Sequence, residues 1–421
     1  MVHSLWSMAE QPHVLFLNRV YPPTGGATGA LLAEMAGALQ ARGYDVTVVT
    51  GPTENGRASS PSDVRVERVG DTPFTDGSHW QRMQTYVARH AGLIRGTLRV
   101  PSPDVIVTKT DPPMLKILGP LLARVTGAQL VHWAQDLYPE VAEAAGVLSE
   151  NGISAGGLRC ASTVALQNHD HIVAVGRCMR ERIIERGVAP ETVSVIPNWT
   201  PSAVASIPHE ENAFREEHDL EDRFVVMYSG NLGLAHSFTP ILDAAAQLQR
   251  TDPAVCILFV GDGPRKSALQ GEVAERELDN VRFLPFQPWD RLAESLSAAD
   301  LHLVTMNPDM EGLVVPSKIY GALRAGRPVL FLGPDGSEAA RLVRENDCGT
   351  VRPEASGRDV AGAIRRWKAH PDERTTAGRR AMAAVRHGKE QAVDAFDRIL
   401  GDVLDRPPAR ETAVPNAVEA T

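Results

Sequence analysis

The fold is decided by residues 13–50, which have the sequence HVLFLNRVYPPTGGATGALLAEMAGALQARGYDVTVVT. Residues 13–18 are apolar and rich in β-forming side chains, and residues 44–50 form a second run of the same kind. Between them, residues 30–42 carry apolar side chains at helical spacing, and Gly43 follows as a helix stop. Both runs are apolar along their length, as strands buried on both faces are. The stretch therefore predicts a strand–helix–strand unit of a parallel sheet covered by helices.

The same alternation continues in two series, separated by the polar, charged segment 201–223, which we interpret as a connector. Further strand-like runs are DVIVT (104–108), QLVHW (129–133), HIVAV (171–175), FVVMYS (224–229), CILFVG (256–261), VRFLP (281–285), LHLVT (301–305) and VLFLG (329–333). We therefore predict an α/β protein with two Rossmann-like, doubly wound domains that face each other across a cleft.

The predicted first domain spans residues 1–198 and the second spans residues 199–385. Residues 386–402 carry an apolar stripe at helical spacing, and we expect this helix to pack back on the first domain. Residues 403–421 have little to bury and are expected to be a disordered tail. Ligands of open α/β sheets bind at the carboxyl ends of the strands, so residues just after the strands are the candidates for function.

The composition excludes several classes of protein. The chain has 43 basic and 52 acidic residues, a net charge of −9, and only 5% aromatic residues, which argues against a nucleic-acid binder. Its widely spaced cysteines, with no C-x-x-C pair, indicate thiols of a reducing cytosol more than disulfides or zinc ligands. They are Cys160, Cys178, Cys256 and Cys348. The first residues lack a secretory signal, and the most apolar stretch, 114–133, contains charged residues and a proline. We expect a cytoplasmic protein, attached at most to a membrane surface.

The first loop after a strand, residues 19–29, contains Gly25 and Gly26. These glycines would let backbone N–H groups approach a ligand before a helix that begins near Thr28. The loop is not G-x-G-x-x-G, and no acidic residue ends the next strand, so a nicotinamide cofactor is not expected. The alternative is a flexible loop that binds no ligand and in which the glycines only allow the chain to turn.

Two loops of the second half also follow predicted strands directly. In residues 228–233 (YSGNLG), Gly230 and Gly233 free the backbone, while Ser229 and Asn231 supply small hydrogen-bonding groups that suit a phosphate or a sugar. Gly261 begins the sequence GDGP, which by itself is equally typical of an ordinary turn.

The strongest local signal is Pro316-Ser317-Lys318. Proline suits the first position of a helix, which would place Ser317 and Lys318 in a first turn whose free N–H groups and dipole favour an anion. A cation there opposes the dipole, so Lys318 is better explained by a bound phosphate than by exposure to solvent.

Taken together, these residues resemble retaining glycosyltransferases of the GT-B fold, family 4. The likeness is greatest to the bacterial branch that builds surface polysaccharides, the colanic-acid and fucosamine transferase type. It covers residues of about 12 to 400 and is carried by six motifs in order. They are YPPTGG (21–26), WAQDLYPE (133–140), VIPN (195–198), YSGNLG (228–233), FVGDGP (259–264) and VVPSKIYGALRAGRPV (314–329).

The resemblance implies that the second domain binds a nucleotide-diphospho-sugar, UDP-linked, and the first binds the acceptor. Ser317, Lys318 and the loop with Ser229, Gly230, Asn231 and Gly233 would neutralise the diphosphate, and Gly261, Pro285, Glu311 and Pro316 would complete the donor site. Gly25 and Gly26 would approach the reacting centre. We see no Asp-x-Asp that would hold a metal ion, and the resemblance implies no cofactor.

The branch resemblance further implies a saccharide acceptor, such as one linked to polyprenyl diphosphate, and an enzyme that works at the inner face of the membrane. Arg82, Arg89, Arg95 and Arg99 would then touch anionic headgroups, or would form a solvated helix face.

The sequence departs from the family pattern in two places. Many members carry two glutamates eight residues apart, and here the corresponding positions are Leu313 and Gly321, with Glu311 as a substitute two residues upstream. Many members also carry an Arg and a Lys in the loop after the first strand of the second domain. Here Asn231 takes the place of the arginine, and His236 lies near that of the lysine.

Asp136 is the best candidate for a general acid or base, because it follows the strand QLVHW at the cleft end of the first domain. The alternative is that it caps the following helix. In a retaining front-face mechanism, the leaving phosphate itself can take the acceptor proton. His132 is interpreted as a hydrogen-bonded core histidine, and Lys109 as either a cleft or a surface residue. The alternative functions are a sugar-nucleotide epimerase of the same fold and a non-catalytic partner subunit.

Overall fold

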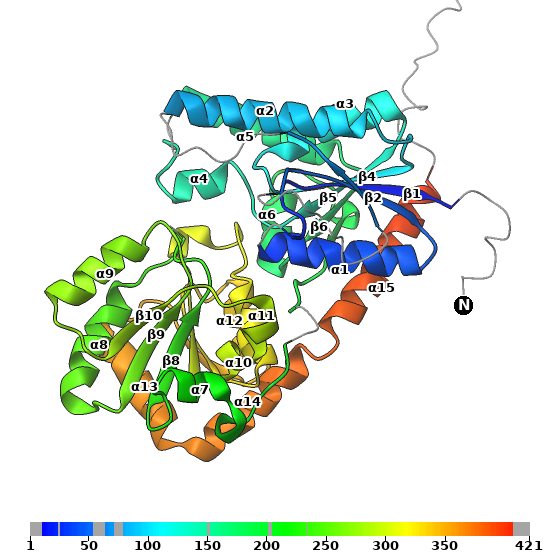
Figure 1. The fold of residues 1–421 in the computed structure, drawn as a ribbon. Helices are drawn as coiled ribbons and strands as arrows, with labels where there is room; N and C mark the ends of the chain where they lie inside the picture. The colour runs from blue at the N-terminus through cyan, green and yellow to red at the C-terminus, as the bar shows by residue number, and fades with distance from the viewer. Residues whose placement is uncertain are drawn as a thin grey trace, which may run out of the picture.

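The computed structural model describes residues 11–23, 26–53, 64–70, 79–149, 152–200, 204–233 and 235–406. Two parallel sheets of seven and six strands form the centres of two domains (Figure 1). Their strand orders are β3-β2-β1-β4-β5-β6-β7 and β10-β9-β8-β11-β12-β13. In both, the order reverses beside the first strand of the domain, as in doubly wound folds. The predicted fold class is therefore confirmed.

The strands of the first domain are β1 (His13–Leu17), β2 (Asp45–Thr50), β3 (Arg65–Arg68), β4 (Val105–Lys109), β5 (Gln129–Ala134), β6 (His171–Ala174) and β7 (Val193–Val195). Its helices are α1 (Ala27–Ala41), α2 (His79–Thr97), α3 (Gly119–Thr126), α4 (Glu140–Ala144), α5 (Ile153–Gln167) and α6 (Arg177–Ile184), with the short 3₁₀ turns η1 (Leu115–Ile117) and η2 (Pro190–Thr192). The central strands β1, β4, β5 and β6 are fully buried, as continuous apolar runs require.

The strands of the second domain are β8 (Phe224–Ser229), β9 (Val255–Val260), β10 (Val281–Leu284), β11 (Leu301–Thr305), β12 (Val329–Leu332) and β13 (Gly349–Arg352). Its helical elements are η3 (His209–Glu211), α7 (Ala213–Glu217), α8 (Thr239–Thr251), α9 (Lys266–Glu275), η4 (Trp289–Arg291), α10 (Leu292–Ser297), η5 (Pro308–Met310), α11 (Lys318–Arg324), α12 (Glu338–Glu345), α13 (Gly357–Ala369) and α14 (Pro371–Ala384). The last helix, α15 (Gly388–Leu404), packs on the first domain. Strands β3, β7 and β13 were not predicted, and all three lie at sheet edges. An edge strand is covered less completely, so sequences such as RVER (65–68) need no apolar run.

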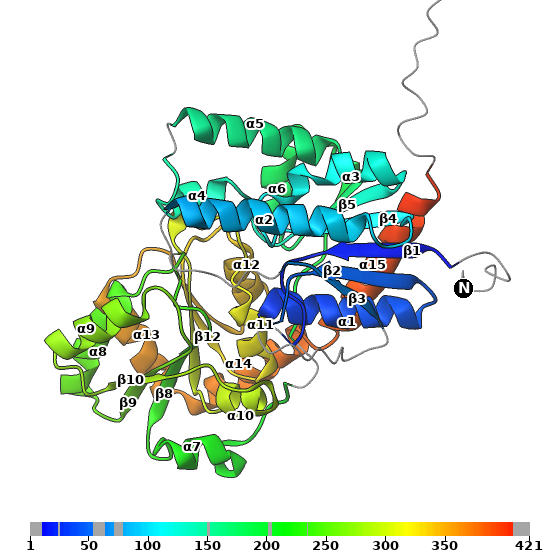
Figure 2. The ribbon, with the colours of Figure 1, turned by 45° about the horizontal axis from the view of Figure 1, so that its top comes forward.

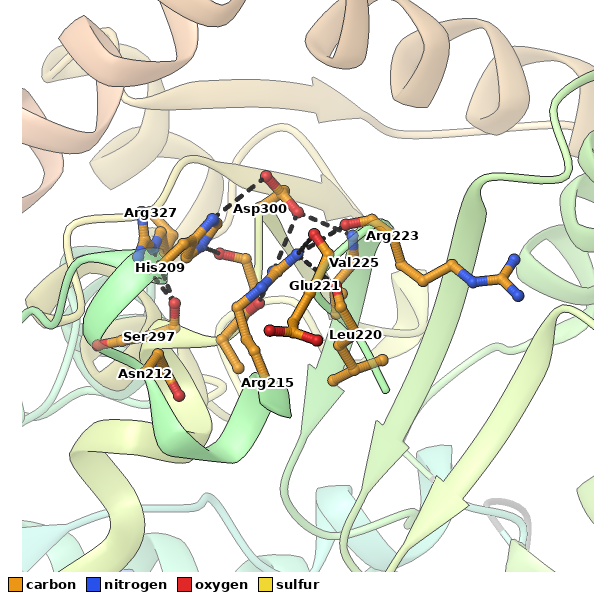
Figure 3. A network of polar contacts seen from close by, with 12 residues as sticks. His209, Asn212, Arg215, Leu220, Glu221, Arg223, Val225, Ser297, Asp300 and Arg327 are labelled. Atoms are coloured by element: carbon orange, nitrogen blue, oxygen red, sulfur yellow. Dashed lines mark hydrogen bonds and ion pairs between the residues drawn. The ribbon is translucent and has the colours of Figure 1, made fainter. Parts of the chain in front are cut away.

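The polar connector before β8 is fastened to the second sheet by a buried network (Figure 3). Arg215 is 4% exposed and donates to the carbonyl oxygens of Ala298 and Leu220, at 2.5 and 2.6 Å. The Asp300 carboxylate accepts from the Val225 N–H at 2.9 Å and lies 3.4 Å from the Arg215 guanidinium. The charges of this segment therefore hold η3 and α7 on the second domain, because a buried charge is tolerated only when it is paired.

The C-terminal part of the chain returns to the first domain, where α15 crosses beside the first sheet (Figures 1 and 2). The Phe396 ring lies 5.3 Å from that of Trp133 and 6.1 Å from that of Phe16, measured between centroids. The Arg42 guanidinium lies 2.9 Å from the carboxylate of Asp397. Thus α15 completes the core of the first domain.

The tail beyond residue 406 lies outside the described residues, and no described helix has the length and apolarity that a bilayer span requires.

Candidate functional site

A cavity of about 790 Å³ lies between the two domains and is lined by residues of both. The first domain and the interdomain segment supply Gly26, Ala27, Leu31, Asp136, Trp199 and Thr200. The second domain supplies Ser229, Gly230, Asn231, Ala235, His236, Phe286, Gln287, Trp289, Leu292, Leu296, Met306, Val314, Val315, Pro316, Ser317, Lys318 and Gly321. The cavity thus lies where the carboxyl ends of β5 and β8 face each other.

The loop after β8 forms one wall and depends on glycine at two positions. Gly230 has φ +132°, and a Cβ added there would lie 3.3 Å from Cε of Lys318. Gly261, at the end of β9, has φ +144°, and a Cβ there would lie 2.1 Å from the carbonyl oxygen of Gly230. Only glycine allows this backbone conformation and this contact. The two glycines therefore bring the Ser229–Asn231 backbone close to the lysine.

Lys318 begins α11 and is half-buried on the cavity wall. Its ammonium donates to the hydroxyl oxygen of Tyr228, which in turn donates to the Asn231 carbonyl oxygen at 2.8 Å. The ammonium also lies 3.0 Å from Nε2 of His236 and 3.9 Å from the centroid of the Tyr228 ring. These described partners are neutral, and burial holds the pKa of Lys318 well below its usual value.

The tautomer of His236 follows from its two contacts. Its Nδ1 lies 2.6 Å from the carbonyl oxygen of Thr305, so Nδ1 carries the proton and donates. Burial, and next the charge of Lys318, lower the pKa of His236 to about 3, so the ring is neutral near pH 7. Nε2 is then free of a proton and accepts from the ammonium. His236 therefore fixes the direction in which Lys318 points.

The start of α11 differs from the prediction by two positions. The helix begins at Lys318, Ser317 is its N-cap residue without a side-chain cap, and Pro316 precedes it. The first position of the helix is therefore not the proline. Ser317 is exposed, and both residues line the cavity beside Lys318. The predicted grouping of Pro316, Ser317 and Lys318 with the loop after β8 is what the structure brings together.

Asp136 is the acidic residue among the described residues that line the cavity. It follows β5, and burial, with a further contribution from the charge of Asp111, raises its pKa to about 6. The interpretation as a helix cap is wrong, because Pro139 is the N-cap residue of α4 and no side chain caps that helix. Asp136 instead forms an isolated antiparallel bridge with Val314 of the second domain. The described lining of the cavity therefore contains one carboxyl group, supplied by the first domain, whose pKa is raised to about 6.

Two other candidate residues of the first domain, His132 and Lys109, are buried inside that domain. His132 is 1% exposed, and its Nδ1 lies 3.0 Å from the Thr108 hydroxyl, so the prediction of a hydrogen-bonded core histidine is confirmed. Lys109 is fully buried and donates to the Thr28 carbonyl oxygen at 3.0 Å. The surface interpretation of Lys109 is therefore wrong, and this residue does not belong to the cavity lining either.

Several predicted site residues are not in the cavity wall. Gly25 lies outside the described residues, whereas Gly26 is a lining residue and the N-cap of α1. Gly233, Gly261 and Pro285 are not among the residues that line the cavity. Glu311 is also outside the lining: a Cβ added at Gly336 would lie 2.0 Å from its Oε1, so its carboxylate packs against the loop before α12. The structure therefore does not place Glu311 where it would replace a family glutamate at the cavity.

The sequence interpretation missed part of the lining. Trp289, which follows β10, lines the cavity beside Phe286 although 49% of its surface is exposed. The sequence FQPWD after a predicted strand was the available signal. Trp199 and Thr200 follow the Pro197-Asn198 junction and also line the cavity. In the described part of the chain, no group of three or more His, Cys, Asp or Glu side chains is arranged to hold a metal ion.

Comparison with known families agrees with the two-domain division. Residues 25–199 match the model of the glycosyl transferase 4-like domain, and residues 210–383 match that of glycosyl transferases group 1. The chain is 29% identical over 257 residues to the probable glycosyltransferase WbjE of Pseudomonas aeruginosa, an alignment that covers 61% of this chain and 64% of that protein, a little under two thirds. It is 28% identical over 353 residues to the putative colanic acid biosynthesis glycosyl transferase WcaI of Escherichia coli K12, covering 76% and 83%.

Among solved structures, HepE of Anabaena in complex with UDP and glucose has the same fold. The TM-score is 0.71 at 20% identity, and the alignment covers 92% of this chain and 99% of that one. The two family models match the two domains in order, and five of the six sequence motifs lie wholly within the matched residues. The chain therefore belongs to the family 4 glycosyltransferases of the GT-B fold, in their bacterial polysaccharide branch.

Proposed function

We propose that this chain transfers a sugar from a UDP-linked donor to a saccharide acceptor during the synthesis of a cell-surface polysaccharide, with retention of the anomeric configuration and without a metal ion. The observation that carries the proposal is the placement of Lys318. Its ammonium lies on the wall of the interdomain cavity with neutral described partners, beside the exposed hydroxyl-bearing Ser317 and the backbone of Gly230. Such a cation is suited to an anion that arrives with the substrate.

The chemistry of transfer explains why a lysine is needed there. When the bond between sugar C1 and the phosphate oxygen breaks, negative charge grows on the departing diphosphate. Preorganised donors that meet this charge in a dry site lower the barrier more than they strengthen ground-state binding. Lys318 is directed by His236 before any ligand arrives, so little reorganisation is required. HepE, which shares the fold, has been solved with UDP and glucose, and this agrees with a donor of the same class.

The rim of the cavity provides surfaces for the other parts of the donor. Phe286 and Trp289 expose aromatic rings at the cavity on the second domain. An exposed ring beside a phosphate site suits stacking with a nucleobase, for which every base offers a π-face. Gly321 stands at a position where many family members have glutamate, and a Cβ there would lie 3.2 Å from Cδ1 of Leu296. Leu296 would thus crowd any larger side chain at Gly321. We place the donor between Phe286, Trp289 and Lys318.

Asp136 stands on the acceptor side of the same cavity. Its carboxyl group has a pKa of about 6, so near neutral pH it is ionised and accepts a proton from an acceptor hydroxyl. In a front-face mechanism the leaving phosphate takes this proton instead, and Asp136 then orients the acceptor. The diphosphate charge is met by Lys318 in both cases, and we therefore expect transfer to continue in the presence of EDTA.

The two alternative functions fit the cavity less well. A sugar-nucleotide epimerase that acts at C2 needs several acidic residues around the proton that it moves, and Asp136 is the acidic residue that the described lining contains. A non-catalytic partner subunit is suggested by Leu313 and Gly321 in place of two glutamates. A half-buried lysine on the wall of a cavity, whose described partners are all neutral, is an unnecessary feature for a subunit without turnover.

One incubation separates these functions. The protein is mixed with a radiolabelled UDP-sugar and a polyprenyl-diphosphate-linked saccharide, in buffer with EDTA, and the products are separated and their anomeric configuration determined by NMR. Transfer of label with retained configuration supports the proposal. Epimerisation of the donor without acceptor would establish the epimerase, and tight binding of UDP without either product would establish the partner subunit. Transfer that requires added Mg²⁺ would overturn metal independence.

The lipid-linked acceptor and a membrane-peripheral location are supported by one surface of the first domain. Helices α2, α3 and α5 lie together over the first sheet in both views (Figures 1 and 2). Their sequences contain five arginines and no Asp or Glu, although the chain has 52 acidic residues. Six of the nine exposed large apolar side chains of the described residues belong to this surface: Val87, Leu98, Leu121, Val125, Leu158 and Val164. Exposed apolar side chains on helices that carry arginines and no acidic residue suit the headgroup region of an anionic bilayer; of these arginines, Arg159 is paired with Glu143 at 2.6 Å.

Sedimentation with vesicles tests the membrane contact. Wild-type protein is expected to sediment with vesicles of phosphatidylcholine and phosphatidylglycerol, and not with phosphatidylcholine alone. Arg95→Glu combined with Arg124→Glu should abolish sedimentation, because each cation near a charged surface contributes about 1 kcal/mol and the change reverses its sign. Arg379→Glu with Arg380→Glu on α14 alters the net charge equally and should have no effect. Equal loss in both pairs would show an effect of net charge alone and would contradict the proposed surface.

A further inference from the structure

A charged contact joins the two domains beside the cavity. Arg177 is the first residue of α6 in the first domain, and Glu338 is the first residue of α12 in the second. Oε2 of Glu338 accepts the backbone N–H of Arg177 at 2.6 Å, and its Oε1 lies 3.1 Å from the Arg177 Nε. The outer end of the same guanidinium pairs with Glu345, at 2.8 and 3.0 Å.

The Glu338 carboxylate lies at the N-termini of two helices at once. Glu338 belongs to the first turn of α12, whose N-cap residue Ser337 accepts a hydrogen bond from the Ala340 N–H. Its carboxylate also accepts a hydrogen bond from the first backbone N–H of α6, that of Arg177. Both helix dipoles favour negative charge at this point. The side chain is 10% exposed, and a carboxylate so buried is stable only when paired, here by Arg177. Separation of the domains would leave this charge without its partners.

The residues around the Arg177–Glu338 contact also touch the segment that precedes Lys318. A Cβ added at Gly176 would lie 3.0 Å from Cγ2 of Val315 and 3.0 Å from Cβ of Glu338, so the start of α6 touches both. On its other side, the segment is held by the Leu137 N–H, which donates to the Leu313 carbonyl oxygen at 2.9 Å. Residues 313–315 are therefore held by the first domain immediately before Pro316, Ser317 and Lys318.

We propose that Glu338 is a positioning residue, which through Arg177 holds the domains closed and thereby fixes Lys318 at its working distance from Asp136. This inference rests on the proposed function, because it assigns a role toward the proposed donor and acceptor sites. Glu338 lines no part of the cavity among the described residues and acts through the segment 313–315. The residues that we propose to bind the donor lie on the second domain. Loss of Glu338 should therefore impair turnover and leave donor affinity nearly unchanged.

The test compares Glu338→Gln with Glu345→Gln. Glutamine keeps the size of Glu338 and removes its charge, so we expect kcat to fall at least about tenfold, while the Kd for UDP changes by less than about threefold. Glu345 is 54% exposed and holds the outer end of the same guanidinium, and exposed ion pairs contribute little. Its variant should keep kcat within about twofold of wild type. Addition of Arg177→Ala to Glu338→Gln should cause little further loss, because both changes remove one contact.

A distance measurement makes the test independent of transfer. Spin labels are attached to the exposed native Cys160 on α5 and to Ser267→Cys on α9, one on each domain. With saturating UDP, wild type and Glu345→Gln should give one narrow distance distribution, whereas Glu338→Gln and Arg177→Ala should give a broad or longer one. An unchanged distribution would overturn the inference even if transfer falls. If the distance between the two domains increases in the variants but the wild-type protein transfers no sugar, the role of the Arg177–Glu338 contact in holding the domains closed is supported and the proposed function fails.

A melting temperature for each variant identifies a merely structural effect. A fall in melting temperature together with a parallel loss of UDP binding would show that Glu338 only stabilises the fold, and would overturn its role in positioning. Arg177→Ala provides the same test from the first domain, should Glu338→Gln fail to fold.

Discussion

The ammonium nitrogen of Lys318 lies 3.0 Å from Nε2 of His236, in a ring that is fixed through Nδ1 by the carbonyl oxygen of Thr305. The neutral ring therefore directs a lone pair at the lysine. This contact joins the start of α11 to the segment between β8 and α8, two parts of the chain that are 82 residues apart. It gives the cation a direction before any ligand is present.

His236→Ala should reduce sugar transfer about 10- to 100-fold. A hydrogen bond to a charged group contributes about 1.5–3 kcal/mol, and that amount corresponds to this change in rate if the bond is needed in the transition state. Turnover and the Kd for UDP are measured for this variant and for His370→Ala, which alters an exposed histidine of the same domain. A loss smaller than twofold for His236→Ala would mean that Lys318 needs no orientation from it.

Binding of UDP should be accompanied by proton uptake. Burial lowers the pKa of Lys318 in the free protein, and a diphosphate beside the ammonium raises it again. Between these two values a proton is taken up on binding, so the affinity for UDP should increase as the pH falls through this interval. Calorimetry at several pH values above about 7, where a phosphate with a second pKa near 6 is already ionised, in buffers of different ionisation enthalpy, gives the number of protons and the pH interval in which they are taken up. Uptake that persists in Lys318→Ala would assign the proton to another group.

The rate of transfer should rise with pH through about 6. Burial, with the charge of Asp111, raises the pKa of Asp136 to about 6, so this carboxyl group is protonated and inactive as a proton acceptor below that value. In Asp136→Asn the rising limb should disappear and the rate at neutral pH should fall at least about 100-fold, in the range for a general base. An unchanged pH profile in this variant would leave the leaving phosphate as the proton acceptor.

Phe396→Ala should lower the free energy of unfolding by about 3–5 kcal/mol, the usual cost of removing a buried phenylalanine. The ring is fully buried between Phe16 and Trp133, so the change leaves a hole in the core of the first domain although it lies near the C-terminus of the described chain. Urea denaturation measures the effect. Arg398→Ala, on the exposed side of the same helix, should change stability by less than about 0.5 kcal/mol. Equal stabilities would show that α15 is not part of this core.

Local sequence patterns were sufficient to predict the inner strands of both sheets. A strand buried on both faces needs an uninterrupted apolar run, and FVVMYS (224–229) is recognisable for this reason. The edge strand RVER (65–68) has no such requirement and could not be recognised. The connector at 201–223 was correctly described as polar, but its sequence does not reveal that Arg215 and Asp300 bury their charges against each other. That pairing depends on residues 85 positions apart.

The candidate site was predictable where it follows strands. Ser229 ends β8 and Gly230 and Asn231 follow it, and the carboxyl ends of parallel strands meet at one edge of a sheet. The contact between Arg177 and Glu338 was not predictable, because it depends on how two separately folded domains approach each other. The same holds for Glu311, whose sequence position suggested the cavity but whose carboxylate packs against Gly336.

The most direct test of the account is the turnover number of Lys318→Ala, measured beside Lys266→Ala. Both lysines begin a helix of the second domain, but Lys266 lies 3.7 Å from Asp262 and is outside the cavity lining. We predict that Lys318→Ala lowers transfer by about 10²–10³, or about 3–4 kcal/mol, as for a lost donor to a developing charge, and leaves the melting temperature unchanged or slightly higher. Lys266→Ala should retain wild-type turnover. A fall of less than about tenfold for Lys318→Ala, or an equal fall for both variants, would contradict the placement of the diphosphate at Lys318.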